Sequence, residues 1–474
     1  MPCKEKLVLI LSLQGINFLM EEDFIIMDRQ QRLGHEPIGK LLFDFSIPAI
    51  VGMLVNALYN IIDRIYIGNI PVIGDVAITG VGITLPIMTI ILAFGMLIGI
   101  GAAACISLKL GRHKKEEAEE ILGNAVTLLI IVGVVISIVG NLFAKDILSL
   151  FGASSNTLVY AKEFVSIIFY GTIFNIISFG LNNCIRAEGS PKIAMITMLL
   201  GAILNIILDP IFIFIFGLGV RGAALATVLS QIVTTIWTMR YYLSGASTLK
   251  IKIKNLKLKW SFMKSIFAIG MSPFSMQLAA SLVQITSNGA LIKYGGDLAV
   301  GAMTIISSIS MIFFMPIFGI NQGSQPIIGF NYGAKQFKRV KDTVKYGAIS
   351  ATIIMLIGFL LVQIHPQIVI KIFNRDKTLV NTTVQGIRIY LGMIPVVGFQ
   401  IISSNYFQSI GKAKISMFLS LLRQVIILIP MLLILPKFFG LIGVWCAGPI
   451  SDALSSLVTG IIFYKDIKKL HIQE

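Results

Sequence analysis

The chain is 474 residues long, 56% of its residues are hydrophobic and only 13% are charged, and its formal net charge is +16 at pH 7. Soluble proteins average about 45–50% apolar and about 25% charged residues, so this composition excludes an ordinary soluble enzyme, a disordered chain and a fibre. It indicates a polytopic membrane protein whose excess Lys and Arg lie in loops on one side of the bilayer. We therefore expect contact with membrane lipid and no nucleic-acid partner.

The first residues precede the apolar pattern of the rest of the chain. Lys4 and Lys6 come before a short apolar run, but no small-residue cleavage site of a signal peptide follows it. We interpret residues 1–40 as a cytoplasmic N-terminal segment that contains an extended start or a flexible tail.

Twelve stretches are long and apolar enough to cross a bilayer as helices, which takes about 20 residues each. They are continuously apolar, whereas transmembrane strands alternate between apolar and polar residues, so the sequence predicts an all-α protein. The spans are expected near 41–67, 76–106, 121–144, 158–182, 191–216, 220–243, 265–293, 297–329, 343–365, 381–408, 413–436 and 440–463.

Positive charge is concentrated in alternate connections between these spans. The connection at 244–264 is rich in Lys, whereas those at 68–75 and 437–440 hold at most one cation. The connection at 366–380 is an exception, with three. Because Lys- and Arg-rich loops stay in the cytoplasm, the pattern predicts that both termini are cytoplasmic in a bacterial plasma (inner) membrane.

The sequence repeats itself at an offset of 222 residues. The paired positions are Gly101 and Gly323, Gly111 and Gly333, Asp75 and Asp297, Gly189 and Gly411, and Lys192 and Lys414. Gly219-Val220 further resembles Gly443-Val444, at an offset of 224. We therefore expect two homologous lobes at 41–243 and 265–463, joined by a basic cytoplasmic linker at 244–264 and followed by a cytoplasmic tail at 464–474.

Two halves with six spans each share one orientation in the membrane, which is the parallel-repeat plan of some secondary transporters. No GxxxxGK[ST] loop is present, so ATP hydrolysis by the chain is not expected. The four Cys and four His residues are dispersed, which argues against a disulfide framework, a zinc site and an enzyme. A duplicated scaffold without a transport role is the alternative.

Acidic residues inside membrane spans are costly and are functional candidates by default. The first half contains Asp63 in the first span and Asp209 in the fifth, with Asn205 one turn before Asp209 and Thr227 in the sixth span. Two carboxylates, an amide and a hydroxyl offer hard oxygen ligands suited to Na⁺, and paired carboxylates can also carry a proton. Alternatively, Asp63 is an interfacial partner of Arg64, and Asp209 ends a helix beside Pro210.

Further residues complete the predicted site. Pro48 lies in the first span, where it permits a bend that could couple ion binding to the shape of a cavity, or only a static kink. The predicted residues of the substrate cavity are Asn56, Tyr59 and Asn182. In the second half, Arg423 and Asp452 are interpreted as a structural ion pair, because the positions equivalent to Asp63 and Asp209 are apolar there.

These residues resemble the MATE (multidrug and toxic compound extrusion) family over about 36–463. The resemblance rests on the proline-then-acid first span, the run Arg186-Ala-Glu-Gly-Ser-Pro, the pair Asn205 and Asp209, the segment from Gly219 to Thr227, and the duplication. It implies two six-helix lobes forming a V around a central cavity. It also implies antiport of amphiphilic, often cationic drugs and dyes against Na⁺ or H⁺.

The resemblance further implies a cation site in the N-terminal lobe, at Asp63, Asn205, Asp209 and Thr227. NorM-like relatives carry acids in helices seven and ten, where this chain has Ser281 with Gln284 and Phe399 with Gln400. Coupling is therefore expected in the first lobe alone. We expect a monomer that needs no cofactor other than the coupling ion. The competing function is a flippase for a lipid-linked oligosaccharide of related duplicated architecture.

Overall fold

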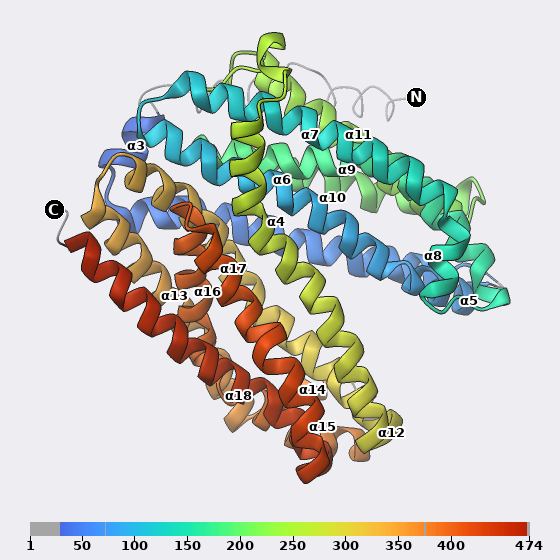
Figure 1. Cartoon of the computed structure of the whole chain (residues 1–474). Coiled ribbons are helices and arrows are strands. Elements are labelled where there is room, and N and C mark those ends of the chain that lie inside the picture. The colour runs from blue at the N-terminus through green and yellow to red at the C-terminus, as the bar shows by residue number, and fades with distance from the viewer. Residues whose placement is uncertain (1–28, 72, 374–375, 472–474) are drawn as a thin grey trace, which may run out of the picture.

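The computed structural model describes residues 29–71, 73–373 and 376–471, so the interpretation of residues 1–28 lies outside them. The described residues form helices and connecting turns, and they include no strand. Figure 1 shows two arms of a V that meet near the short helix α3 (Arg29–His35) and the end of the last helix. The all-α membrane fold predicted from the sequence is confirmed.

The upper arm in Figure 1 is built from the first half of the chain. Its elements are α4 (Ile38–Gly68), α5 (Gly74–Ile83), α6 (Leu85–Gly111), α7 (Lys115–Leu142), α8 (Ala144–Leu150), α9 (Ser155–Ala187), α10 (Pro191–Pro210), the π-helix η1 (Ile211–Ile215) and α11 (Val220–Leu243). A short 3₁₀ helix, η2 (Ile253–Leu256), lies in the connection to the second half.

The lower arm is built mostly from the second half. Its elements are α12 (Trp260–Gly333), α13 (Phe337–Ile364), α14 (Pro366–Ile370), α15 (Lys377–Tyr390), α16 (Ile394–Ser409), α17 (Ala413–Leu421), the π-helix η3 (Leu422–Leu428) and α18 (Ile429–His471). Two of these helices contain a break, because Gly296 in α12 and Gly440 in α18 have non-helical backbone angles.

The breaks decide how many times the described chain crosses the membrane. Nine helices pass on length and apolar composition, and the bent pair α15 and α16 forms one more span. Since α12 divides at Gly296 and the segment Ala413–Leu470 divides at Gly440, the described residues form twelve spans. This is the number predicted from the sequence.

The duplication is visible in the backbone. Gly189 and Gly411, which are 222 residues apart, both have positive φ, at 100° and 82°. Gly219 and Gly440 also match, with φ/ψ of 54°/−131° and 55°/−135°. The sequence-based pairing of Gly219 with Gly443 is therefore wrong, and the offset here is 221.

Gly443 has a different equivalent in the first half. A Cβ at Gly222 would lie 2.6 Å from the backbone carbon of Phe212, and a Cβ at Gly443 would lie 2.6 Å from that of Leu435. Both glycines therefore let one helix pack against the backbone of the preceding one. The mistaken alignment arose because Gly219 and Gly443 are each followed by Val, although their structural roles differ.

The two halves touch at one end of the V. We call this the basic end, and define it by the connections at 111–115, 187–191, 243–260, 333–337 and 409–413 together with the end of α18. A Cβ at Gly101 of α6 would collide with the carbonyl oxygen of Ile266 in α12, and one at the equivalent Gly323 would lie 2.8 Å from Ser46 N in α4. The same close approach thus occurs twice, once on each side of the pseudo-symmetry axis.

The segment predicted as a linker is docked on the first half. Asn124 of α7 donates to the carbonyl oxygens of Asn255 and Lys257, at 3.3 Å each, and accepts from Lys259 N at 2.7 Å. At the other boundary, α18 continues to His471, so the predicted tail at 464–474 begins as helix. Asp466 there accepts a hydrogen bond from Tyr406 Oη at 2.8 Å.

Candidate functional site

The structure joins three of the predicted ligands in one cluster between α10 and α11. Asn205 Nδ2 lies 3.2 Å from Asp209 Oδ1 and 3.3 Å from Thr227 Oγ1. Asn205 and Asp209 share a face because they are four residues apart on α10. Their side chains are removed from solvent, at 2% and 0% exposure. The amide therefore holds the carboxylate and the hydroxyl at a fixed spacing.

The hydrogen bonds leave the oxygen atoms of this cluster free to accept. Thr227 Oγ1 donates its proton to the carbonyl oxygen of Ala223, at 3.0 Å, so its lone pairs face the site. Asp209 Oδ2 and Asn205 Oδ1 are buried without a hydrogen-bond partner among the described residues, and so is Asp63 Oδ1. Unpartnered buried acceptors are costly and rare. Three of them on facing helices fit a bound cation or proton.

Asp63 approaches the cluster from α4, which packs against both α10 and α11. Tyr59 lies on the same helix, one turn before Asp63. Arg64, the next residue, is exposed, and no ion pair within 4.0 Å joins it to Asp63 among the described residues. The two acids therefore lie on helices that pack against each other, as the predicted cation site requires.

The backbone beside Asp209 departs from the α-helix. Pro210 lacks an N–H, and the next five residues form η1, where Phe216 N donates to the carbonyl oxygen of Ile211 at 2.9 Å. Short π segments are frequent at functional sites, since they widen the helix and redirect side chains. The interpretation of Asp209 as a mere helix end does not fit, because the chain continues in helical form through η1.

The chemistry of the ligand atoms in this cluster determines which ions it can bind. Carboxylate, amide and hydroxyl oxygens suit hard cations such as Na⁺, and a carboxylate pair can hold a proton. The described residues contain no group of three or more His, Cys, Asp or Glu arranged to hold a metal ion. The sequence analysis missed Gln231, whose buried Oε1 also lacks a hydrogen-bond partner among the described residues. Gln231 lies four residues after Thr227 on α11, and this spacing could have predicted that the two side chains share a face of the helix.

The remaining site predictions are placed as follows. Pro48 is buried within α4, which is continuous from Ile38 to Gly68. Asn56 is exposed on the same helix and accepts from Asn60 Nδ2 at 3.1 Å. Asn182 does not join Asn56 and Tyr59, because its amide is buried and donates to the carbonyl oxygen of Ala194 at 2.8 Å. That hydrogen bond ties α9 to α10.

The ionic pair of the second half is formed in the structure. Arg423 Nε donates to Asp452 Oδ1 at 2.7 Å, and the guanidinium lies 5.8 Å from the ring centroid of Phe314. Ser451 Oγ donates to the carbonyl oxygen of Arg423 at 2.6 Å. Arg423 lies in η3, so an interrupted helix carries the charged side chain in each half. Here the carboxylate already has a cationic partner, whereas Asp209 forms no ion pair with any described residue.

The MatE family model matches residues 48–211 and, separately, residues 273–434. The chain belongs to the MATE family. One match lies within each of the two halves found from the internal repeat, and together they identify a multi-pass membrane transporter rather than an enzyme. The resemblance seen in the sequence is therefore confirmed.

Curated MATE relatives are similar along most of the chain. The multidrug export protein MepA of Staphylococcus aureus strain MRSA252 is 28% identical over 428 residues, which cover 90% of this chain and 94% of that protein. MepA of Staphylococcus haemolyticus is 28% identical over 437 residues, covering 92% and 96%.

Solved MATE structures share the fold. The MATE multidrug transporter DinF-BH, solved as a complex, is 41% identical, with a TM-score of 0.85 over 93% of this chain and 98% of that one. An outward-facing multidrug resistance MATE transporter of the MOP superfamily is 26% identical, with a TM-score of 0.86 over 93% and 98%.

Proposed function

We propose that this chain is a secondary multidrug exporter, which moves amphiphilic, cationic drug-like molecules out of the cell in exchange for Na⁺ or H⁺. The observation that supports it most is the set of three buried, unpartnered oxygens at Asp63, Asn205 and Asp209. Membership of the MATE family and the export function of MepA support the class of cargo.

The coupling follows from competition between two cations. With both carboxylates ionised, the first lobe carries an uncompensated negative charge, which favours a positively charged cargo near Tyr59 and Asn56. When Na⁺ or H⁺ occupies the Asp63 and Asp209 cluster, that attraction is lost and the cargo is released. Linkage requires the reciprocal effect, so bound cargo weakens binding of the ion.

Orientation decides the direction of transport. We place the basic end in the cytoplasm of a bacterial plasma membrane, because its connections and the end of α18 are rich in Lys and Arg. In this orientation the halves touch on the cytoplasmic side and the arms of the V diverge toward the outside (Figure 1). The structure would then be a cargo-releasing conformation.

The test is dye efflux from proteoliposomes in which the Na⁺ gradient and the pH gradient are imposed separately. We expect one gradient to drive efflux of a cationic dye, and Asp209→Asn and Asp63→Asn each to abolish that dependence. Asp297→Asn, which neutralises an exposed acid in the second half, is the matched control and should keep it. Full gradient-driven efflux by both variants would rule out the proposal.

A further inference from the structure

Two arginines connect the halves at the basic end, one from each half. Arg186, at the end of α9, is 5% exposed and donates to Asn183 Oδ1 at 3.0 Å and to Gln322 Oε1 of α12. The bond to Gln322 crosses from the first half to the second. The surrounding residues are small or polar and enclose a cavity of about 10 Å³, enough for one water molecule.

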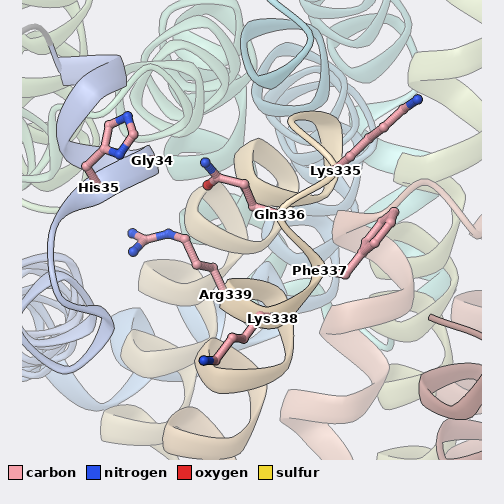
Figure 2. A pocket seen from close by; sticks show the side chains of 7 residues that line it. All are labelled: Gly34, His35, Lys335, Gln336, Phe337, Lys338 and Arg339. Carbon is pink, nitrogen blue, oxygen red and sulfur yellow. The ribbon is translucent and has the colours of Figure 1, made fainter. Parts of the chain in front are cut away.

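Arg339 makes the reciprocal connection from the second half. Its Nη2 donates to the carbonyl oxygens of Leu33 and Glu36, at 3.0 and 2.8 Å, and its Nε donates to Asn331 Oδ1 at 2.9 Å. Figure 2 shows the guanidinium directed toward α3, whereas Lys335 points away from it. The segment it holds precedes the first span.

That segment is fixed to the first half. Arg32 of α3 donates to Asp44 Oδ2 of α4 at 3.0 Å and pairs with Glu36 at 3.1 Å, and Lys40 of α4 pairs with Glu36 at 2.8 Å. When the two halves separate at the basic end, either these ion pairs or the bonds of Arg339 must break. The bonds of Arg339 cross the boundary between the halves.

The acceptors share one chemical property. Gln322 Oε1 and the carbonyl oxygens of Leu33 and Glu36 are neutral, and the structure records no carboxylate bonded to either arginine in its described part. Removing one partner of a buried ion pair leaves an isolated charge at high cost, whereas an arginine bonded to neutral oxygens can exchange them for water. Such contacts close an interface and still allow it to open.

Resting on the proposed function, we propose that Arg186 and Arg339 are positioning residues that hold the cytoplasmic side of the exporter closed. In the described part of the chain, their side-chain hydrogen bonds go to neither the predicted cation site nor the predicted cargo residues, so their role is to set the population of the closed state. Weakening either contact should shift the equilibrium toward the conformation open at the basic end.

The experiment measures opening directly, with no transport required. In a background whose native cysteines are replaced by alanine, Ser107→Cys places a thiol at a fully buried position beside Arg186 and Gln322. We expect a membrane-impermeant maleimide, applied from the basic side in proteoliposomes, to label it about tenfold faster in Arg186→Gln and in Arg339→Gln. Arg112→Gln removes the same charge from an exposed position at this end and should leave the rate unchanged.

A second variant distinguishes loss of the contact between the halves from a folding defect caused by changing Arg186. Gln322→Ala removes only the acceptor in the other half, while Asn183 still binds Arg186. It should also accelerate labelling, and Arg186→Lys should restore a rate between wild type and Arg186→Gln. Unchanged labelling in Gln322→Ala and Arg339→Gln would overturn the proposal. If gradient-driven efflux fails in the wild type while labelling still responds, only the proposed function is refuted.

Discussion

His113 and Lys335, 222 residues apart, adopt the same left-handed backbone conformation, with φ of 57° and 60°. They are the two non-glycine residues with positive φ in the described chain. Each lies two residues after a glycine that ends a basic-end helix, Gly111 or Gly333. The two repeats therefore share this turn and its left-handed residue, although the side chain at that position differs between them.

Glycine at either position should stabilise the protein. A left-handed conformation costs a non-glycine residue about 1–2 kcal/mol, partly offset by the greater freedom that glycine gives the unfolded chain. We expect His113→Gly and Lys335→Gly each to raise the free energy of unfolding by about 0.5–1 kcal/mol. Thermal unfolding in detergent would measure it.

The matched controls are the preceding residues. Arg112 and Ala334 have φ of −85° and −76°, where glycine offers no relief. Arg112→Gly and Ala334→Gly should lower the unfolding temperature through backbone entropy alone. If glycine changed the unfolding temperature equally at residues 112, 113, 334 and 335, the left-handed conformation would have no energetic cost.

Spacing along the chain was sufficient to predict the features that lie within one helix or repeat at a fixed offset. The span pattern, the lobes and the shared face of Asn205 and Asp209 follow from periods of about 20 residues, 222 residues and one helical turn. Gly219 was aligned with Gly443 because both are followed by Val. The structural equivalent, Gly440, lies at an offset of 221, one residue less than the main offset of 222.

The spacing of residues along the chain did not predict the contacts between helices. Asn182 was predicted to line a substrate cavity, and its hydrogen bond to the carbonyl oxygen of Ala194 could not be predicted, because that acceptor is a backbone atom without a sequence signature. The bond from Arg186 to Gln322 joins residues 136 positions apart, at positions that the repeat does not relate. Such pairs depend on how whole helices pack, and the composition of each helix does not fix that.

The glycines where the halves meet should resist enlargement. A Cβ at Gly101 or Gly323 meets the backbone of the opposite half, so Gly101→Ala and Gly323→Ala should each destabilise the closed structure by about 1–3 kcal/mol. Gly289 is an exposed helical residue with nothing within 4 Å of a Cβ, and Gly289→Ala should be neutral or stabilising. Thermal unfolding distinguishes these outcomes, and a neutral Gly101→Ala would contradict the close approach.

The linker should be released by removing its buried carboxylate anchor. Glu119 is 3% exposed and accepts hydrogen bonds from Lys250 N, at 3.3 Å, and from Lys252 Nζ. The bond to Glu119 raises the pKa of Lys252 above its usual 10.5, so this lysine is fully charged at pH 8, where the contact is tested. We expect Glu119→Gln to accelerate trypsin cleavage at the linker lysines at pH 8, about tenfold.

Its control is Glu116→Gln, which removes the same charge from an exposed position on α7. Cleavage there should match wild type. If both variants are cut at the wild-type rate, the other contacts of the linker are sufficient to hold it, among them the bonds of Asn124 to Lys257 and of Thr127 to Leu256.

The ion pair of Arg423 and Asp452 should show strong coupling in a double-mutant cycle. The side chains are 26% and 12% exposed, so removing one partner leaves a largely buried charge, which costs about 3 kcal/mol. Arg423→Met and Asp452→Asn should each lower the free energy of unfolding by that amount, whereas the double variant should approach wild type. The coupling measured by chemical unfolding should therefore exceed about 2 kcal/mol. Additive losses would mean that each side chain has found other partners. The double variant lacks the Asp452 carboxylate. If its transport still depends on the ion gradient, coupling does not need this carboxylate, which supports the N-terminal lobe as the site of coupling.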